Sequence, residues 1–201
     1  MTERIRKHES APRFTLGILA LVMSSSWGCA STAQQARRDR LELERERSTA
    51  ELIRKGEASS AVGDMTRAEQ YFVAALHSGT RERFIVSRLL MVCVADQRYP
   101  VAAEYADDYL RRHPGDLDIA FAAASIHAAL GQRERARALL EALIQQRPAW
   151  PEPHFTLASV LREDNDAEAL ALADTHDLTY LKLEPRGPLA EMAKARLRRT
   201  P

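Results

Sequence analysis

A spacing of 34 residues recurs through the middle of the chain and constrains its fold more than any other feature. Pro114 and Pro148 are 34 residues apart, and three alanines, Ala68, Ala102 and Ala136, follow one another at the same step. The same register relates two further sets, which are Gly63, Gln97 and Gly131, and Gly56, Leu90 and Ala124. A period of this length is typical of repeat proteins, in which each repeat is one supersecondary unit that buries its apolar face against its neighbours.

Small residues, turn glycines and closing prolines in this register resemble the tetratricopeptide repeat family. The resemblance implies antiparallel helix pairs over 49–186, with repeats at 49–82, 83–116, 117–150 and 151–186. The second repeat is the weakest copy, because Leu90 and Tyr109 are large where the family has small residues. The positions that carry the pattern are Gly56, Gly63, Ala68, Ala102, Pro114, Gly131, Ala136 and Pro148.

The expected fold is therefore all-α, an antiparallel helix-pair solenoid of about 3.5–4 repeats with a C-terminal capping helix over 187–201. Abundant alanine, leucine, arginine and glutamate agree with it, because these are strong helix formers. Pro185 closes the fourth repeat later than Pro114 and Pro148 close theirs, which predicts a longer second helix there. In the last helix the pattern predicts one packed side, which carries Leu189, Met192, Ala193 and Leu197.

The first 28 residues have the pattern of an export signal. A basic stretch with Arg4, Arg6, Lys7 and Arg13 precedes ten uncharged residues over 14–23, and small residues follow. Ten apolar residues are too few for a helix that spans a bilayer, which needs about 20. A buried amphipathic helix is the alternative, but the apolar run lacks the polar face that such a helix needs. We expect a signal peptide at 1–28.

Cys29 follows the small-residue exit of this segment and resembles the lipidated cysteine of bacterial lipoproteins. Gly28 fits the family pattern, whereas Trp27 and Ser26 depart from it. The resemblance implies acylation of Cys29 and, because Ala30 rather than Asp follows, an outer-membrane lipoprotein on the periplasmic face. The alternative is a soluble periplasmic protein, with plain signal cleavage after Ala30 or after Ala33.

The segment 29–48 is expected to form a charged helical tether. Residues 34–46 are almost all polar or charged and contain neither glycine nor proline. Opposite charges three and four residues apart, such as Arg38 and Glu42, support a solvated helix. A partner-binding helix is the weaker interpretation, because no apolar stripe runs along the segment.

The sequence carries no sign of catalysis. It has no nucleophile elbow, metalloprotease, phosphate-loop or C-x-x-C motif, and its six histidines are scattered. His127 and His154 stand at repeat positions that are usually packed, and Cys93 is expected to be buried. A net charge of +1 gives no overall attraction to nucleic acid. We therefore expect no enzyme activity, no metal, no cofactor, no nucleic acid and no small-molecule substrate.

Function is instead expected on a surface. Members of the tetratricopeptide family bind peptides in the concave groove lined by their first helices. Transferred to this chain, the resemblance implies a largely apolar partner groove with Ile53, Phe84, Met91, Val94, Phe121 and Phe155. The alternative is that these residues pack against the charged lead-in or the C-terminal helix. The paired lysine and asparagine with which some relatives hold carboxylates are absent, so an acidic chaperone tail is a poor ligand.

Together these features predict an exported, lipid-anchored adaptor or assembly factor that serves an envelope machine, such as a pilus, secretin, secretion or motility complex. In architecture it resembles pilotins. The alternatives are a fixed structural subunit of a trans-envelope complex, an enzyme accessory protein or regulator of peptidoglycan synthesis, and a soluble exported or cytoplasmic adaptor.

Overall fold

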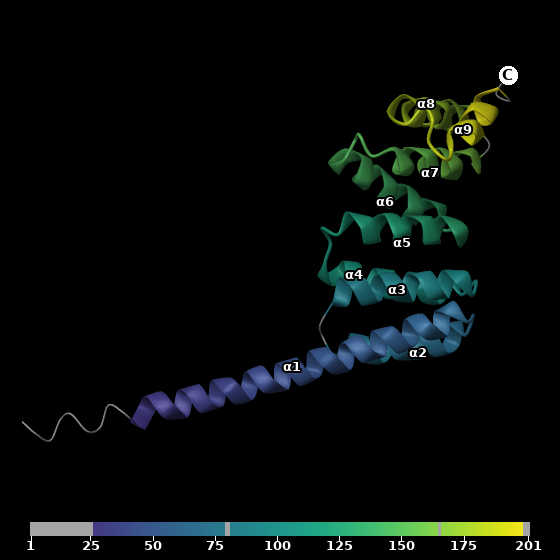
Figure 1. The fold of residues 1–201 in the computed structure, drawn as a ribbon. Helices are drawn as coiled ribbons and strands as arrows, with labels where there is room; N and C mark the ends of the chain where they lie inside the picture. Colours follow the sequence, from purple (N-terminus) through teal and green to yellow (C-terminus); the bar gives the residue numbers. More distant parts are fainter. Residues whose placement is uncertain (1–25, 79–80, 165, 199–201) are drawn as a thin grey trace, which may run out of the picture. The chain divides into compact units, whose positions relative to one another are not determined.

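The computed structural model describes residues 26–78, 81–164 and 166–198, and these residues form α-helices joined by short turns (Figure 1). In chain order the helices are α1 (Ser26–Ala61), α2 (Met65–Leu76), α3 (Glu82–Ala95), α4 (Tyr99–Arg112), α5 (Leu117–Ala129), α6 (Arg133–Gln146), α7 (Pro151–Arg162), α8 (Ala167–Leu183) and α9 (Ala190–Leu197). The predicted all-α class is confirmed. The predicted signal peptide at 1–28 lies almost wholly outside the described residues, as does the side chain of Cys29.

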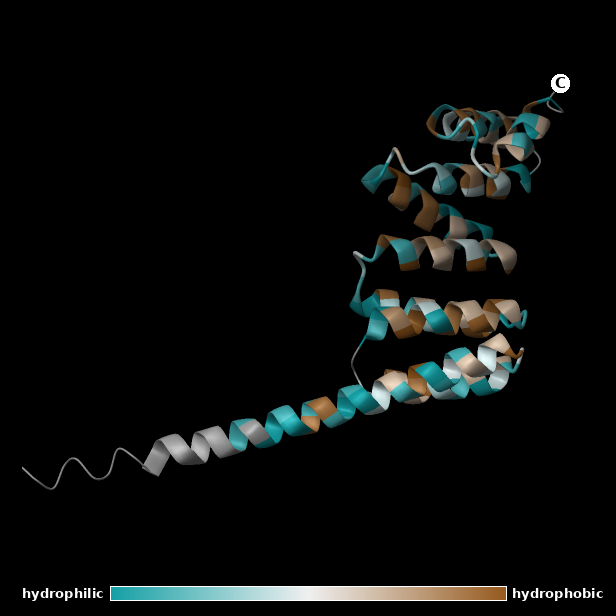
Figure 2. Cartoon of the chain, in the orientation of Figure 1, coloured by the Kyte–Doolittle hydropathy of each residue, from teal (hydrophilic) through white to brown (hydrophobic). Residues whose placement is uncertain are grey.

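The chain divides into two units, residues 1–46 and residues 47–201. The described part of the first unit is the beginning of α1. Its described side chains from Gln34 to Glu46 are all exposed, and Figure 2 shows this stretch as mostly hydrophilic. Helix α1 continues without a break past the predicted end of the tether at residue 48. The boundary between tether and repeats is therefore a change in burial within one helix.

The second unit is a stack of helix pairs in which each helix from α2 to α9 packs on the next one along the chain. The second, third and fourth pairs begin at Glu82, Leu117 and Pro151, within one residue of the starts that the 34-residue register predicts. This arrangement confirms the predicted helical solenoid. In the described residues no helix is both long and apolar enough to span a membrane.

The small residues of the register lie where helices meet. Ala68, Ala102 and Ala136 are fully buried. Gly56 faces the ring of Phe72, and a Cβ atom at this position would lie 2.6 Å from a ring carbon. Only a residue without a side chain allows α1 and α2 to approach this closely.

The turns within the repeats explain the glycines of the register. Gly63 and Gly131 have φ angles of 83° and 69°, and Gln97 takes the same left-handed conformation at 57°. Left-handed backbone suits glycine because it has no Cβ atom. Pro114 and Pro148 each follow a helix that ends two residues earlier, at Arg112 and Gln146. Proline disfavours helical geometry in the residue before it, so these positions end the second helices.

The end of the array differs from the inner repeats. Helix α8 has 17 residues, whereas α4 and α6 have 14 each, as the late Pro185 predicts. Helix α9 packs on α8 and buries Ala190 and Ala193 near Phe155 and Tyr180. Met192, which was expected on the packed side, is 52% exposed. The small side chains of α9, rather than its methionine, make the close contact.

Candidate partner-binding groove

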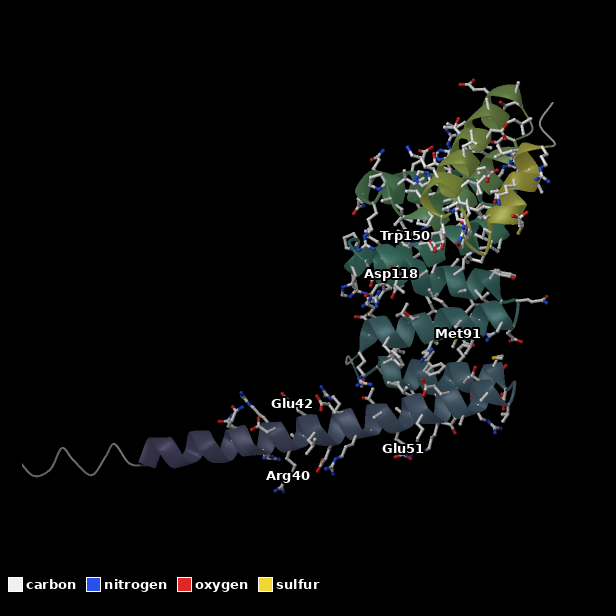
Figure 3. All side chains as sticks on the ribbon, turned by 45° about the horizontal axis from the view of Figure 1, so that its top comes forward. Arg40, Glu42, Glu51, Met91, Asp118 and Trp150 are labelled. Atoms are coloured by element: carbon white, nitrogen blue, oxygen red, sulfur yellow. The ribbon has the colours of Figure 1, made fainter. Side chains whose placement is uncertain are left out.

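An apolar groove of about 390 Å³ lies between α3 and α5. Figure 3 shows Met91 on α3, and Asp118 at the edge of the stack near Trp150. The groove is lined by residues of α3 (Ser87, Leu90, Met91 and Val94), by Tyr99 at the start of α4, and by residues of α5 (Asp118, Ile119, Ala122, Ser125 and Ile126). We call this set the α3–α5 groove.

The groove exists because α3 and α5 are the first helices of neighbouring repeats. Each packs closely on α4, while direct contact between α3 and α5 is limited. The small side chain of Ala122 leaves space on the α5 side of the groove. Met91 is 48% exposed, so a flexible apolar side chain lies open to solvent. Methionine adapts its shape readily to different apolar partners.

The two serines of the groove add little polarity. The Ser87 hydroxyl donates to the Arg83 carbonyl at 2.9 Å, and the Ser125 hydroxyl donates to the Phe121 carbonyl at 3.0 Å. Because both hydroxyls are used within their own helices, the groove presents a mainly apolar surface. Such a surface favours a ligand with an apolar side chain.

A charged cluster forms one end of the groove. The Arg83 guanidinium donates to Asp116 at 2.7 Å and to Asp118 at 2.5 Å. Burial acts to raise the pKa of Asp116, but hydrogen bonds from the Ile119 N–H, Arg83 and Tyr109 outweigh it and lower the pKa. Asp116 therefore stays ionised and fixes Arg83. Asp118, whose side chain is 61% exposed, is the carboxylate that a ligand could reach.

A second hollow of about 500 Å³ begins on the other side of Asp118, around Trp150. The Phe121 ring packs against Trp150 with centroids 5.1 Å apart, and the Arg147 guanidinium lies 5.7 Å from the Trp150 ring. Aromatic rings at surface hollows supply large contact areas at low entropic cost. This hollow extends the candidate surface from α5 toward α7.

Of the predicted groove residues, Met91 and Val94 line the α3–α5 groove. Phe121 instead packs against Trp150, which lines the second hollow. Phe84 is 37% exposed, and the Arg88 guanidinium lies 4.7 Å from its ring centroid. Phe84 does not line the groove.

Two predicted groove residues are buried, and their assignment was wrong. Ile53 is 6% exposed and belongs to the core of the first repeats. Phe155 is 7% exposed because α8 and α9 cover it. The Tyr180 ring lies 5.4 Å away, and the Arg196 guanidinium lies 4.1 Å from the Phe155 ring. For Phe155 the alternative interpretation, packing against the C-terminal helix, is the one that the structure supports.

Much of the groove wall was not predicted from the sequence, namely Leu90, Tyr99, Ile119, Ala122 and Ile126, and neither was Trp150. The predicted residues stand at the repeat positions that line the concave face in the family, whereas these five residues stand at other positions of the repeat, and Tyr99 belongs to the second helix α4. The sequence feature that could have revealed this wall is the set of apolar residues in α5 next to the small residue Ala122. Trp150 lies just before α7 and outside the repeat pattern.

The two histidines and the cysteine that were expected to be packed are buried. His127 is buried and bonds Gln132 at 2.7 Å and Asp107 at 3.1 Å. Buried His154 contacts the Pro148 carbonyl at 3.0 Å. Cys93 is buried, and burial is the main factor that raises the pKa of its thiol to about 11. Among the described residues, no group of three or more His, Cys, Asp or Glu side chains is placed to hold a metal ion.

Comparison with known proteins supports the tetratricopeptide repeat family. The family model for this repeat matches residues 94–160, which include most of the α3–α5 groove. Comparison with curated protein sequences gives no significant match.

Solved structures show the same fold. A tetratricopeptide repeat protein from Parabacteroides merdae is 20% identical with a TM-score of 0.65, over 76% of this chain and 59% of that one. The present chain thus spans less than two thirds of that relative. MamA from Desulfovibrio magneticus is 15% identical with a TM-score of 0.61, over 75% and 92%. YrrB, described as a tetratricopeptide protein with an unusual peptide-binding site, is 18% identical with a TM-score of 0.63, over 84% and 88%.

Proposed function

We propose that this protein is a non-enzymatic adaptor that binds a segment of a partner protein in the α3–α5 groove. The observation that carries the proposal is an open apolar groove of about 390 Å³ within an array of helix-pair repeats. The tetratricopeptide repeat is generally a non-catalytic scaffold for protein interaction, and YrrB is a relative described with a peptide-binding site. Both facts favour a protein partner over a small-molecule substrate.

The lining of the groove defines the partner's chemistry. Met91, Val94 and Ile126 favour an apolar side chain. Asp118 at the rim favours a backbone amide or a basic group next to that side chain, because a carboxylate only accepts hydrogen bonds. The expected ligand is therefore an apolar, non-acidic peptide segment.

Selection from a phage-displayed random peptide library tests this proposal. Peptides with apolar anchors should bind the wild-type chain, and Met91→Asp should weaken their binding about tenfold or more, because a charge would enter an apolar contact. Val62→Asp is the matched control, since Val62 is 81% exposed and lies outside the groove. The groove is not the binding site if the selected peptides bind both variants equally well.

We further propose that Cys29 is lipidated and that the protein faces the periplasm from the outer membrane, where it serves an envelope machine. The support is the sequence pattern before Gly28 and Cys29. Stable anchoring needs at least two acyl chains, which this modification supplies. Labelled palmitate should enter the wild-type protein but not Cys29→Ser, and the variant should leave the membrane fraction. A wild-type protein that never incorporates palmitate would rule out the anchor.

An assembly factor and a fixed subunit differ in one measurable respect. A factor leaves its client after assembly, whereas a subunit stays in the finished complex at fixed stoichiometry. Quantitative co-purification from cells, before and after assembly is blocked, separates the two roles.

A further inference from the structure

Helix α8 exposes two residues whose equivalents in α4 are at least partly buried. Ala103 and Leu110 of α4 are buried and half-buried, because α5 follows and covers that side of α4. Two repeat periods later the equivalent residues, Ala171 and Leu178 of α8, are exposed, and Leu178 is 57% exposed. These α8 residues are exposed because the next helix along the chain is short. Helix α9 has only eight residues and leaves this side of α8 open.

Several exposed residues of α8, together with the half-buried Thr179, are spaced symmetrically about Thr175. Leu172 and Leu178 lie three residues on either side, Ala171 and Thr179 lie four residues away, and Glu168 and Lys182 lie seven residues away. Spacings of three, four and seven residues place side chains on one face of a helix. They also form the pattern along which two helices pack as a coiled coil.

This face is apolar between its two charged ends. Within the fully described helix α8, no charged side chain between Glu168 and Lys182 is exposed, since Asp174 and His176 are partly buried and Asp177 is buried. The threonine hydroxyls are also used within the helix. Thr175 donates to the Ala171 carbonyl at 3.0 Å, and Thr179 donates to the Thr175 carbonyl at 2.8 Å. We call this set, Glu168, Ala171, Leu172, Thr175, Leu178, Thr179 and Lys182, the α8 face.

We propose that the α8 face binds the α8 face of a second copy of this chain, with the two helices antiparallel and a two-fold axis beside Thr175. In this pairing Leu172 packs beside Leu178 of the partner subunit, and Glu168 meets Lys182 of the partner subunit. A self-complementary patch of this kind is what a two-fold interface requires. Antiparallel helices also place opposite ends of their dipoles together. The inference does not depend on the proposed function of the α3–α5 groove.

The size of the face sets the expected strength. A seam from Glu168 to Lys182 is about 21 Å long at 1.5 Å per residue. One helix pair of this length buries less than the roughly 1,600 Å² of a standard stable interface. The dimer should therefore be weak and depend on concentration. It would present two α3–α5 grooves, which would strengthen binding to any partner that carries two matching segments.

Sedimentation velocity of the purified full-length chain in mild detergent, over a wide concentration series, tests the dimer. The wild type should shift from monomer to dimer as concentration rises, and Leu178→Asp should weaken the association about tenfold or more. The matched control is Ala142→Asp, because Ala142 is exposed on α6, away from the α8 face. A wild type that stays monomeric throughout, or a dimer that Leu178→Asp does not affect, overturns the proposal.

Charge reversal tests the antiparallel register. Glu168→Lys alone and Lys182→Glu alone each replace two attractive pairs with two repulsive ones, so each should weaken the dimer. The double variant restores both pairs and should recover wild-type association. If the double variant associates no better than the two single variants, the register is wrong.

A disulfide at the symmetry axis gives a second test, because a covalent bond traps the dimer even when its affinity is low. Two Thr175→Cys chains should form an intermolecular disulfide on mild oxidation, because residues on the axis can bring their Cα atoms within about 7 Å. Gln145→Cys, exposed on α6, and the wild-type chain are the controls for random pairing and for Cys29. Equal cross-linking in all three chains would contradict the proposed axis.

Discussion

Replacement of Gly56 by alanine should destabilise the array although alanine is the better helix former. Gly56 lies within α1 and faces Phe72, which is fully buried on α2. A Cβ atom at position 56 would lie 2.6, 2.8 and 2.9 Å from three carbons of the Phe72 ring. Contacts this short force either the ring or the helix to move.

Two opposing effects set the size of the change. Replacing glycine by alanine inside a helix stabilises it by about 1 kcal/mol. Adding a group to a closely packed site costs about 1–3 kcal/mol. Because Phe72 is enclosed and its ring is rigid, we expect the free-energy cost of close packing to exceed the gain in helix stability from alanine. The net loss of unfolding free energy should be up to about 2 kcal/mol.

Urea denaturation followed by circular dichroism measures this change, and a double-mutant cycle isolates its cause. Phe72→Leu should itself lower stability, because it removes buried carbon atoms. In that background the contact with position 56 is relieved, so Gly56→Ala should become neutral or stabilising. An interaction energy of about 1–3 kcal/mol between the two sites is expected. If Gly56→Ala stabilises the chain with Phe72 present, the argument from close packing fails.

Three further outcomes are expected. Ala136→Leu should lower the unfolding free energy by about 1–3 kcal/mol in the same assay, because Ala136 is fully buried where helices meet; an unchanged midpoint would contradict the register. Burial and the neighbouring His154 lower the pKa of His176, so this histidine binds protons more readily in the unfolded chain than in the folded one. The free energy of unfolding should therefore fall as the pH drops through the histidine range. His176→Gln should remove this part of the pH dependence, and an unchanged profile would speak against the lowered pKa. Cys93, with its pKa raised to about 11, should resist a thiol reagent until denaturant is added, and rapid labelling of the folded chain, located by mass spectrometry, would show that the site is open.

The fold could be predicted from the sequence because the repeat ties each small residue to one structural role. Ala68, Ala102 and Ala136 share a register and are all buried between helices. Gly63 and Gly131 adopt the left-handed turns that their position requires. A period that fixes both burial and turns leaves few alternative folds.

The groove was harder to predict, because it depends on which helix covers which face. Phe155 stands in the same repeat position as Phe121, yet α8 and α9 cover Phe155 while Phe121 reaches Trp150. A repeat pattern predicts where a residue lies within its own pair of helices. The helices that cover and bury that residue belong to the next pair or, at the end of the array, include α9. Ile53 is buried for a related reason, because it packs into the core of the first repeats.

The 34-residue register also could not predict how the end of the array packs. A C-terminal capping helix was expected over 187–201. Helix α9 covers the side near Tyr180, while Leu172 and Leu178 stay exposed. The length of α9 decides this, and neither the repeat period nor composition determines where that helix begins and ends.

The central claim is that the α3–α5 groove holds the partner, and site-specific photo-crosslinking in cells tests it most directly. A photoreactive amino acid at position 91, in the groove, should form an adduct with one defined protein. The same amino acid at position 104, which is exposed on α4 outside the groove, should not. The adduct from position 91 should also disappear when Ser125 is replaced by arginine, which would fill the opposite wall. Adducts that form equally from positions 91 and 104, or only from position 104, would contradict the account.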